Sequence, residues 1–280
     1  MKRALITGGA GFVGRNLSRH LQENDWDVLS VDIRNQLDCI DYFDHSIARF
    51  DLVVHAAAAG PHRKAIDTQP RNFPYNVMLD AAAIDWAMRT RQGHFVYLSS
   101  AAVYDSSACG YGSFIETKGH VGDPFDHYGA TKRVGEKMIE ASRLPYTIVR
   151  PFSGYGSDQS IEFPFGAFVD RARRREHPFH IWGSGEQVRD FIHIDDICRA
   201  IITLATENIL GPVNLCTGIG ITLKKLAYLC LKQVDYNPQI HLDRSESEGV
   251  DFRVGDPTYL NYFYTPKITI EEGVRRALEE

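Results

Sequence analysis

Tyr128 and Lys132 stand four residues apart in the run Tyr-Gly-Ala-Thr-Lys. If residues 128–142 form a helix, the two side chains share one face, with their Cβ atoms about 6 Å apart. A free phenol titrates near roughly 10, so it exchanges protons at neutral pH only where its surroundings favour the phenolate. A neighbouring ammonium group stabilises the phenolate and lowers the phenol pKa. The pair therefore predicts a tyrosine that acts as a general acid or base, with Lys132 as its charged neighbour.

A glycine-rich turn near the N-terminus predicts where a cofactor binds. Residues 4–7 are a short apolar run, and the turn Gly8-Gly9-Ala10-Gly11-Phe12-Val13-Gly14 and a helical pattern follow it directly. A strand, a glycine turn and a helix in this order are typical of a dinucleotide-binding unit. The glycines let the backbone turn tightly, and they let a pyrophosphate approach the helix N-terminus, where free N–H groups favour anions.

The next strand predicts which dinucleotide is bound. Residues 27–32 are mostly apolar and end in Asp32, which lies 18 residues after Gly14. An acidic residue at about this distance is typical of a carboxylate that accepts hydrogen bonds from the adenosine ribose. Because a carboxylate repels a 2′-phosphate, Asp32 favours NAD over NADP. Arg34 could instead pair with such a phosphate, so NADP stays open as the second alternative.

Three further segments continue the alternation of strands and helices. Residues 51–58 are a buried strand that runs into small residues, where Ala57 would let a cofactor lie close to the strand end. Residues 76–89 are rich in alanine and helical in pattern, as expected of a crossover helix on a parallel sheet. Residues 94–104 read as the next strand, with a fifth strand at 145–151.

Two hydroxyl groups, those of Ser99 and Ser100, fall at the carboxyl end of the strand at 94–104. Ligands of open α/β sheets bind outside this edge. We therefore expect Ser100 to hydrogen-bond a substrate oxygen beside Tyr128.

The order of elements predicts an α/β fold, with a Rossmann-type doubly wound parallel sheet and a smaller C-terminal substrate-binding lobe. Residues 1–150 would form the dinucleotide-binding domain, with a returning segment near 187–210. Residues 151–280 would form mainly the substrate-binding lobe, since the regular alternation loosens after Pro151.

Composition excludes several functional classes. The 280 residues are 44% hydrophobic and 24% charged, which is the profile of an ordinary soluble globular protein. A net charge of −5 and a pI near 6.1 argue against nucleic acid as a partner. There is no run of 18 apolar residues, so we expect no membrane partner. Five scattered cysteines without metal spacing predict reduced thiols in a cytoplasmic protein, and no metal site.

Four motifs together resemble one family. They are the glycine turn at 7–14, the run Ser99-Ser100-Ala-Ala-Val-Tyr, the pair Tyr128-x-x-x-Lys132, and the run Val188-Arg189-Asp190-Phe-Ile-His-Ile-Asp-Asp. From residue 4 to about residue 274 the chain resembles an extended short-chain dehydrogenase/reductase of the NAD-dependent epimerase/dehydratase family. The resemblance implies an enzyme that binds NAD and acts on a nucleotide sugar.

The resemblance also implies roles for individual residues. Tyr128 would be the acid/base, Lys132 would bind the nicotinamide ribose and lower the phenol pKa, and Ser100 would bridge Tyr128 to the sugar. Arg189 would bind the diphosphate, whose oxygens suit a guanidinium fork. The implied cofactor-binding set is Gly8, Gly11, Phe12, Val13, Gly14, Asp32, Ala57, Asn76, Ser99, Tyr128 and Lys132, and the implied substrate-binding set is Ser100, Tyr128, Ser153 and Arg189.

Departures from the family pattern narrow the reaction. Ala101 and Ala102 stand where sugar 4,6-dehydratases of the family carry an Asp-Glu pair, so that elimination lacks its acid and base. Ser153 stands where an Asn often contacts the substrate. The segment at 35–50 is short and lacks the usual Asp-hydrophobic pair beside the adenine.

The resemblance then favours a nucleotide-sugar epimerase that acts at C4 through a transient ketone. The alternative is an NAD(P)H-dependent reductase of an NDP-4-keto sugar, because the run Glu248-Gly249-Val250-x-x-Arg253-Val254-x-Asp256 looks like the tail of some keto-deoxysugar reductases. A third alternative is a non-catalytic dinucleotide sensor, although such proteins generally lose the Tyr-Lys pair.

Relatives often dimerise through the helix that bears the Tyr-Lys pair and its neighbour. Residues 132–141 offer Val134, Met138 and Ile139 for such a contact. The resemblance therefore implies a homodimer.

Overall fold

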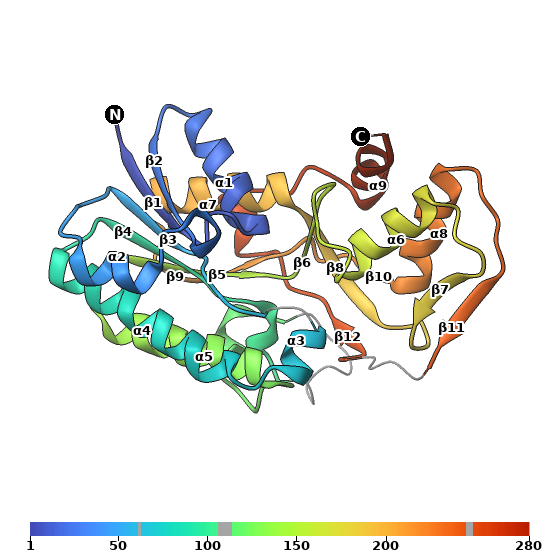
Figure 1. The fold of residues 1–280 in the computed structure, drawn as a ribbon, viewed down its shortest axis with the longest axis horizontal. Helices are drawn as coiled ribbons and strands as arrows, with labels where there is room; N and C mark the ends of the chain where they lie inside the picture. The colour runs from blue at the N-terminus through green and yellow to red at the C-terminus, as the bar shows by residue number, and fades with distance from the viewer. Residues whose placement is uncertain (61–62, 106–113, 245–248, 280) are drawn as a thin grey trace.

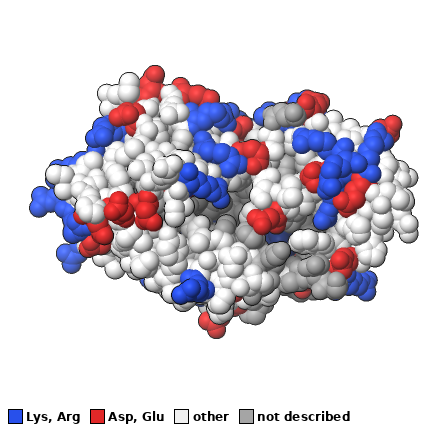
Figure 2. Space-filling view, in the orientation of Figure 1, with Lys and Arg blue, Asp and Glu red and all other residues white. Residues whose placement is uncertain are grey.

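The computed structural model describes residues 1–60, 63–105, 114–244 and 249–279. The chain folds into two lobes that lie side by side, a larger one that contains the N-terminus and a smaller one that contains the C-terminus (Figure 1). The surface is hollowed between them, and Lys and Arg side chains border the hollow on the side of the larger lobe (Figure 2).

The larger lobe is built on a six-stranded parallel sheet with the order β2-β1-β3-β4-β5-β9. Successive residues of a strand point to opposite faces, so Ala4 and Ile6 join one buried cluster and Leu5 joins the other. Both faces are therefore apolar, which confirms the predicted doubly wound sheet. The strands are β1 (Arg3–Thr7), β2 (Asp27–Val31), β3 (Leu52–His55), β4 (His94–Leu98), β5 (Tyr146–Pro151) and β9 (Gly211–Leu215).

Helices cover both faces of this sheet (Figure 1). On one face lie α1 (Phe12–Gln22) and α7 (Ile194–Thr206), and on the other lie α2 (Cys39–His45), α4 (Asn72–Thr90) and α5 (His127–Ala141). The short helix α3 (Arg63–Thr68) lies near the smaller lobe. Four short 3-10 turns are η1 (Ile33–Asn35), η2 (Ala101–Val103), η3 (Glu116–Lys118) and η4 (Leu260–Tyr262).

The expected strand at 94–104 is wrong in its second half. Strand β4 ends at Leu98, and the next residues form the turn η2, for which Ser100 is the N-cap. The Ser100 hydroxyl accepts a hydrogen bond from the N–H of Ala102 at 3.1 Å. A serine side chain competes for backbone N–H groups in this way, and so it ends the strand.

Residues 32–51 form η1 and α2 but no strand, so β2 is an edge of the sheet. The short segment at 35–50 therefore holds the helix α2 and the end of η1, and it adds no strand to the sheet. The side chain of Asp38 caps α2 by accepting from Ile40 N–H at 2.7 Å.

The smaller lobe packs its own core between short strands and three helices. Strand β8 pairs with β6, β10 and β12, and β7 pairs with β11. The strands are β6 (Ser153–Tyr155), β7 (Phe179–Trp182), β8 (Val188–His193), β10 (Gly220–Thr222), β11 (Ile240–Asp243) and β12 (Phe252–Arg253), and the helices are α6 (Pro164–Arg173), α8 (Leu223–Gln233) and α9 (Ile270–Glu279). Between β8 and β10 the chain returns to the larger lobe through α7 and β9.

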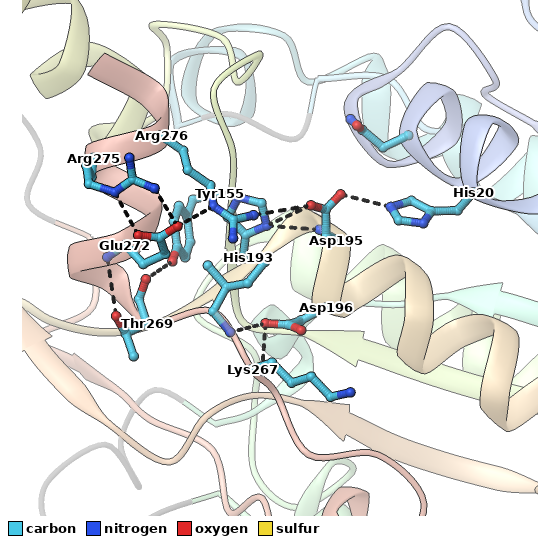
Figure 3. A network of polar contacts seen from close by, with 12 residues as sticks. His20, Tyr155, His193, Asp195, Asp196, Lys267, Thr269, Glu272, Arg275 and Arg276 are labelled. Atoms are coloured by element: carbon cyan, nitrogen blue, oxygen red, sulfur yellow. Dashed lines mark hydrogen bonds and ion pairs between the residues drawn. The ribbon is translucent and has the colours of Figure 1, made fainter. Parts of the chain in front are cut away.

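A polar network joins the lobes at the start of α7 (Figure 3). Asp195 accepts from His20 of α1 at 2.8 Å, and its other oxygen lies 3.9 Å from Arg276 of α9. The neighbouring Asp196 is buried and accepts from the backbone N–H groups of Lys267 and Ile268. The two carboxylates therefore tie the final segment of the chain to helices of the larger lobe.

Candidate active site

Helix α5 places Tyr128 and Lys132 one turn apart, as expected. Asp126 caps the helix by accepting from the N–H of Gly129 at 2.9 Å. A Cβ at Gly129 would lie 2.1 Å from the carbonyl oxygen of Ala102, so only glycine lets the helix lie this close to η2. This close approach brings Tyr128 near the Ser100 hydroxyl, which acts on the phenol and favours its phenolate.

The pKa of Tyr128 is raised, which contradicts the expected lowering. Burial is the largest cause, because it disfavours the phenolate, and the negative charges of Asp80 and Asp126 add to it. The hydrogen bond from Ser100 and the charge of Arg253 act in the opposite direction. In this state the phenol is a proton donor at neutral pH, and its deprotonation requires additional positive charge at the site.

Lys132 is almost fully buried, with 2% of its surface exposed. Its ammonium nitrogen lies 5.0 Å from the centre of the Tyr97 ring. Burial lowers the pKa of Lys132, whereas the carboxylates of Asp80 and Glu136 raise it. The carboxylates of Asp80 and Glu136 therefore compensate the buried ammonium of Lys132.

A buried ion pair supports α5 one turn beyond Lys132. Glu136 accepts two hydrogen bonds from Arg150 of β5, at 2.8 and 2.7 Å, and one from His120 at 2.6 Å. The hydroxyl of Ser99 also donates to Glu136. Ser99 therefore holds the end of β4 to α5, and its hydroxyl is engaged on the core side of the strand.

The glycine turn lies at the carboxyl end of β1 and leaves open space beside the start of α1. Helix α1 begins after Gly11, and no side chain caps its N-terminus. A Cβ at Gly14 would lie 2.2 Å from the carbonyl oxygen of Gly8, whereas a Cβ at Gly11 would meet only that oxygen, at 3.0 Å. Gly8 adopts a φ of 68° and lies against Ala57 of the neighbouring chain segment. An uncapped helix start beside open space suits a pyrophosphate, so these residues fit a dinucleotide.

Asp32 lies beside this turn and is 8% exposed. One carboxylate oxygen accepts from the N–H of Ala10 at 3.0 Å, and the other accepts from the N–H of Arg34 at 2.9 Å. The guanidinium of Arg34 donates to the carbonyl oxygen of Ala10 at 3.2 Å. Both residues named for the choice between NAD and NADP therefore lie at the same end of the turn.

The other residues expected at the cofactor lie along the same edge of the sheet. Asn76 is buried on α4 and exchanges two hydrogen bonds with the backbone of Ala59, at 2.8 and 3.0 Å, so it fixes the segment after β3. The side chain of Val13 packs on the core, and Phe12 packs on it beside the same helix start. These two residues can offer a phosphate their backbone N–H groups.

Two of the expected substrate residues, Ser153 and Arg189, come from the smaller lobe, whereas Ser100 and Tyr128 come from the larger one. Ser153 of β6 pairs with Phe191 of β8, and Arg189 lies two residues earlier on β8. Asp190 is buried and accepts from the N–H groups of Thr217 and Gly218, so it organises the loop after β9.

Arg253 is a further candidate site residue, to which the sequence motifs assigned no role. Parallel pairing places Arg253 of β12 directly beside Arg189 of β8, with both side chains on one face of the sheet. The charge of Arg253 also reaches the phenol of Tyr128. Arg253 belongs to the run at 248–256 that resembles keto-deoxysugar reductases, and that resemblance could have indicated it as a site residue. Residue 248 of this run lies outside the described residues.

The part of the chain that the structure describes contains neither a candidate metal cluster nor a helix that could span a membrane. No group of three or more His, Cys, Asp or Glu side chains there could hold a metal ion. Among those residues no helix is long and apolar enough to cross a membrane. Four cysteines are free and buried, and Cys109 lies outside the described residues.

The fold and the site define a short-chain dehydrogenase/reductase. The chain belongs to the NAD dependent epimerase/dehydratase family, whose model matches residues 4–216. It is therefore an enzyme of that family, as the four motifs predicted.

Curated relatives match nearly the whole chain at low identity. The GDP-L-fucose synthase of Escherichia coli is 26% identical over 98% of this chain and 94% of its own length. A putative UDP-glucose 4-epimerase of Methanocaldococcus jannaschii is 25% identical over 98% of this chain and 96% of its own length.

Among solved structures, a Thermus thermophilus UDP-glucose 4-epimerase in complex with NAD superposes with a TM-score of 0.86 at 19% identity, over 99% of this chain and 98% of that one. A dTDP-glucose 4,6-dehydratase of Streptomyces venezuelae with NAD bound gives 0.86 at 22% identity, over 99% and 96%. Identities this low show the fold alone.

Proposed function

We propose that the protein is an NAD-dependent nucleotide-sugar epimerase that inverts C4 through a transient ketone. The observation that carries the proposal is the meeting of Tyr128 and Ser100 at the sheet edge that also bears the glycine turn. The names of the relatives, which include a putative UDP-glucose 4-epimerase, support a sugar nucleotide as substrate. Ala101 and Ala102 are buried and carry no acid or base, which disfavours a 4,6-dehydratase.

Tyr128 removes the proton from the C4 hydroxyl and later returns it to the C4 oxygen. Ser100 hydrogen-bonds the same oxygen and holds it beside the phenol. When bound beside these residues, NAD would supply the acceptor and donor of the C4 hydride and a positive ring charge that favours the phenolate. Lys132 binds the ribose of the nicotinamide, so that phenol, carbon and hydride acceptor share one geometry. No cofactor is consumed over the cycle.

Asp32 supports NAD as the cofactor, because its carboxylate would lie where a 2′-phosphate would otherwise sit. Arg34 is near enough to pair with such a phosphate, so the comparison of NAD with NADP tests this step directly. The proposal expects the protein to bind NAD more tightly than NADP in equilibrium dialysis. Tighter binding of NADP would reverse the assignment.

Arg189 and Arg253 would bind the diphosphate of the substrate. Two guanidinium groups on adjacent strands match the negative charge of two linked phosphates. Ser153, on the neighbouring strand β6, would contact the sugar side of the same ligand.

The experiment that tests the function uses the purified full chain without added cofactor. We expect nucleotide released on denaturation to include NAD, and we expect the protein to interconvert a C4 pair of UDP-, GDP- or dTDP-sugars. Product ratios are read by chromatography against standards. Absence of activity on every nucleotide sugar would end this proposal.

The second candidate is a reductase of an NDP-4-keto sugar, favoured by the likeness to a GDP-L-fucose synthase. The same residues would serve it, with Tyr128 as proton donor to the keto oxygen. A reductase consumes NAD(P)H in proportion to product, so steady loss of absorbance at 340 nm would distinguish it from an epimerase, which shows none.

We further propose a cytoplasmic homodimer that forms through α4 and α5. Met78 of α4 and Val134 of α5 are 50% and 39% exposed, which supports such a face. Ile139 does not belong to it, because it is fully buried against the sheet, and Met138 packs partly on the same core. Sedimentation equilibrium would show twice the mass of one chain, and Val134→Lys would shift it toward the monomer.

A further inference from the structure

A second carboxylate lies beneath the Tyr128–Lys132 pair. Asp80 of α4 is 1% exposed. It accepts a hydrogen bond from the Tyr97 hydroxyl at 2.6 Å and one from His55 at 3.0 Å. A Cβ at Gly135 of α5 would lie 2.7 Å from Asp80 Oδ2, so the carboxylate lies directly against the helix that carries Lys132.

Both carboxylate oxygens of Asp80 are hydrogen-bonded, Oδ1 with His55 and Oδ2 with Tyr97. On its other side the His55 ring is hydrogen-bonded to Thr7, with 2.7 Å between Nδ1 and Oγ1. The carboxylate is therefore held in place by side chains from two strands, β3 and β4.

Four charged side chains are buried together here, and they balance in pairs. Glu136 forms two hydrogen bonds with Arg150. That leaves Lys132 and Asp80, whose charges stabilise each other and which both contact Tyr97, the first over its ring and the second at its hydroxyl. A buried ammonium is costly unless an opposite charge compensates it.

We propose that Asp80 is a positioning residue that supplies the buried counter-charge of Lys132 and, through Tyr97, fixes where that ammonium sits. The inference rests on the proposed function for its effect on turnover, but not for its effect on Lys132 itself. The groups that face Asp80 are His55 from β3, Tyr97 from β4, and Lys132, Tyr128 and Glu136 from α5.

The sign of the effect follows from the charges. Burial lowers the pKa of Lys132 and Asp80 opposes that lowering, so removing the carboxylate should let the ammonium lose its proton at lower pH. Removing Asp80 also takes away a negative charge that raises the pKa of Tyr128, so its direct effect on the phenol opposes the loss of the Lys132 charge. We expect the loss of the Lys132 charge to dominate, because that ammonium would also bind the nicotinamide ribose. Activity should then be lost at a lower pH on the alkaline side of the profile.

The test compares Asp80→Asn with two matched variants in the full-length protein. Asn keeps the shape and can still accept from Tyr97. Tyr97→Phe removes that hydrogen bond but keeps the charge of Asp80. Asp85→Asn removes an exposed carboxylate from the same helix α4, where it pairs with the exposed Arg89.

The first readout is the titration of Lys132 in the protein without substrate, followed by NMR of ¹³C-labelled lysine and assigned with Lys132→Met. Asp80→Asn should move the Lys132 titration to lower pH, while Asp85→Asn and Tyr97→Phe leave it near the wild-type position. An unchanged titration in folded Asp80→Asn, or an equal shift in Tyr97→Phe, would overturn the proposal. Because no substrate is used, this outcome is independent of whether the protein is an epimerase.

The second readout is the pH profile of turnover, once an active substrate is found. Asp80→Asn should lower kcat at pH 8 by about tenfold or more with a smaller change in KM, and activity should recover as the pH falls. A uniform loss at every pH would show a structural role only and would contradict the proposal. If no sugar nucleotide reacts, the proposed function fails while the Lys132 titration still decides the role of Asp80.

Discussion

At the scale of single residues, the site is governed by how buried charges compensate one another. Tyr128 has its pKa raised by burial and by Asp80, so the chain alone leaves it protonated. Ser100 and Arg253 act in the opposite direction and favour its phenolate. A phenol arranged in this way responds strongly to any further positive charge that arrives with a ligand.

Replacing Tyr128 with Phe removes the only proton that this group can exchange. We expect kcat to fall by about 10² to 10⁴, the usual contribution of a general acid or base. Binding of NAD, measured by calorimetry, should change by less than about threefold, since the phenol contributes little of the nucleotide's contact surface. Wild-type turnover in folded Tyr128→Phe would exclude the assigned role.

The buried ion pair of Glu136 and Arg150 should make the free energy of unfolding fall in acid. Although burial opposes the shift, hydrogen bonds from Arg150 and His120 lower the pKa of Glu136 to about 2. A carboxyl group with a lowered folded pKa stabilises the fold above its unfolded pKa and loses that contribution as the pH falls toward the folded value. Glu136→Gln should cost about 3–5 kcal/mol at pH 7, because Arg150 stays buried without its counter-charge, although it keeps its hydrogen bonds to Tyr104 and to the carbonyl of Glu116.

The pH dependence provides the control for this prediction. In urea titrations between pH 5 and pH 2.5, the wild type should lose stability steadily, and Glu136→Gln should lose less. Glu272→Gln is the comparison, because its pKa is also lowered to about 2 but by exposed arginines of α9. Solvent screens that pair, so its replacement should change little. Equal effects of the two substitutions would contradict the buried-pair argument.

At the scale of elements, glycines decide how closely the parts of the site can approach. Gly129 and Gly135 let α5 lie against η2 and Tyr97. Gly14 lets α1 begin against the turn after β1, and Gly8 lets that turn lie against the segment after β3. Their role is steric, because a Cβ at any of the four would come closer than 3 Å to a neighbouring atom. Gly11 differs, since its missing side chain leaves space for a ligand.

The two kinds of glycine predict two kinds of variant. Gly14→Ala should destabilise the fold by about 1–3 kcal/mol, because the new Cβ overlaps the Gly8 carbonyl. Gly11→Ala should leave the melting temperature nearly unchanged and weaken NAD binding by at least about tenfold, through contact with the pyrophosphate. Thermal melts and calorimetry separate the two effects. A Gly11→Ala protein that binds NAD normally would show that the turn does not hold the pyrophosphate.

The local patterns sufficed to predict the elements that carry these residues. The run at 4–14 has a strand, a turn and a helix in a fixed order, and Tyr128 and Lys132 depend only on helical spacing. Ser100 was placed on the right segment but in a strand, because apolar residues 101–103 continue the strand pattern while the serine side chain ends it. Asp80 and Glu136 could not be predicted, because their partners lie far away in sequence on other strands and helices.

At the scale of the whole molecule, the site depends on how the two lobes are positioned relative to each other. The proposed cofactor residues lie in the larger lobe, and Arg189 and Arg253 lie in the smaller one. The network of Figure 3 joins the lobes at the start of α7. Asp195 connects α1 with α9 there, and it also receives a hydrogen bond from Arg19 at 3.2 Å. On the side of the glycine turn, Arg15 of α1 donates to Asp158 at 2.7 Å.

Asp195→Asn tests this connection. The hydrogen bond from His20, together with the charges of His193 and Arg19, holds the pKa of Asp195 well below its usual range against the effect of burial. Its stabilising contribution is therefore present above the pKa of an unfolded Asp and is lost as the pH falls below it. The substitution should cost about 1–3 kcal/mol at pH 7, the range for hydrogen bonds to a charged group.

The loss should fall on the connection between lobes rather than on the sheet. Hydrogen exchange in Asp195→Asn should rise in α9 and at the start of α7, while β1 and β4 keep their protection. Asp41→Asn is the control. The Asp41 side chain is 77% exposed and pairs with the similarly exposed His45, so the substitution should leave both exchange and stability unchanged. Because Arg189 and Arg253 lie in the lobe that would be loosened, KM for a nucleotide sugar should rise more than kcat falls. A change in kcat alone would place the effect at Tyr128 and not between the lobes.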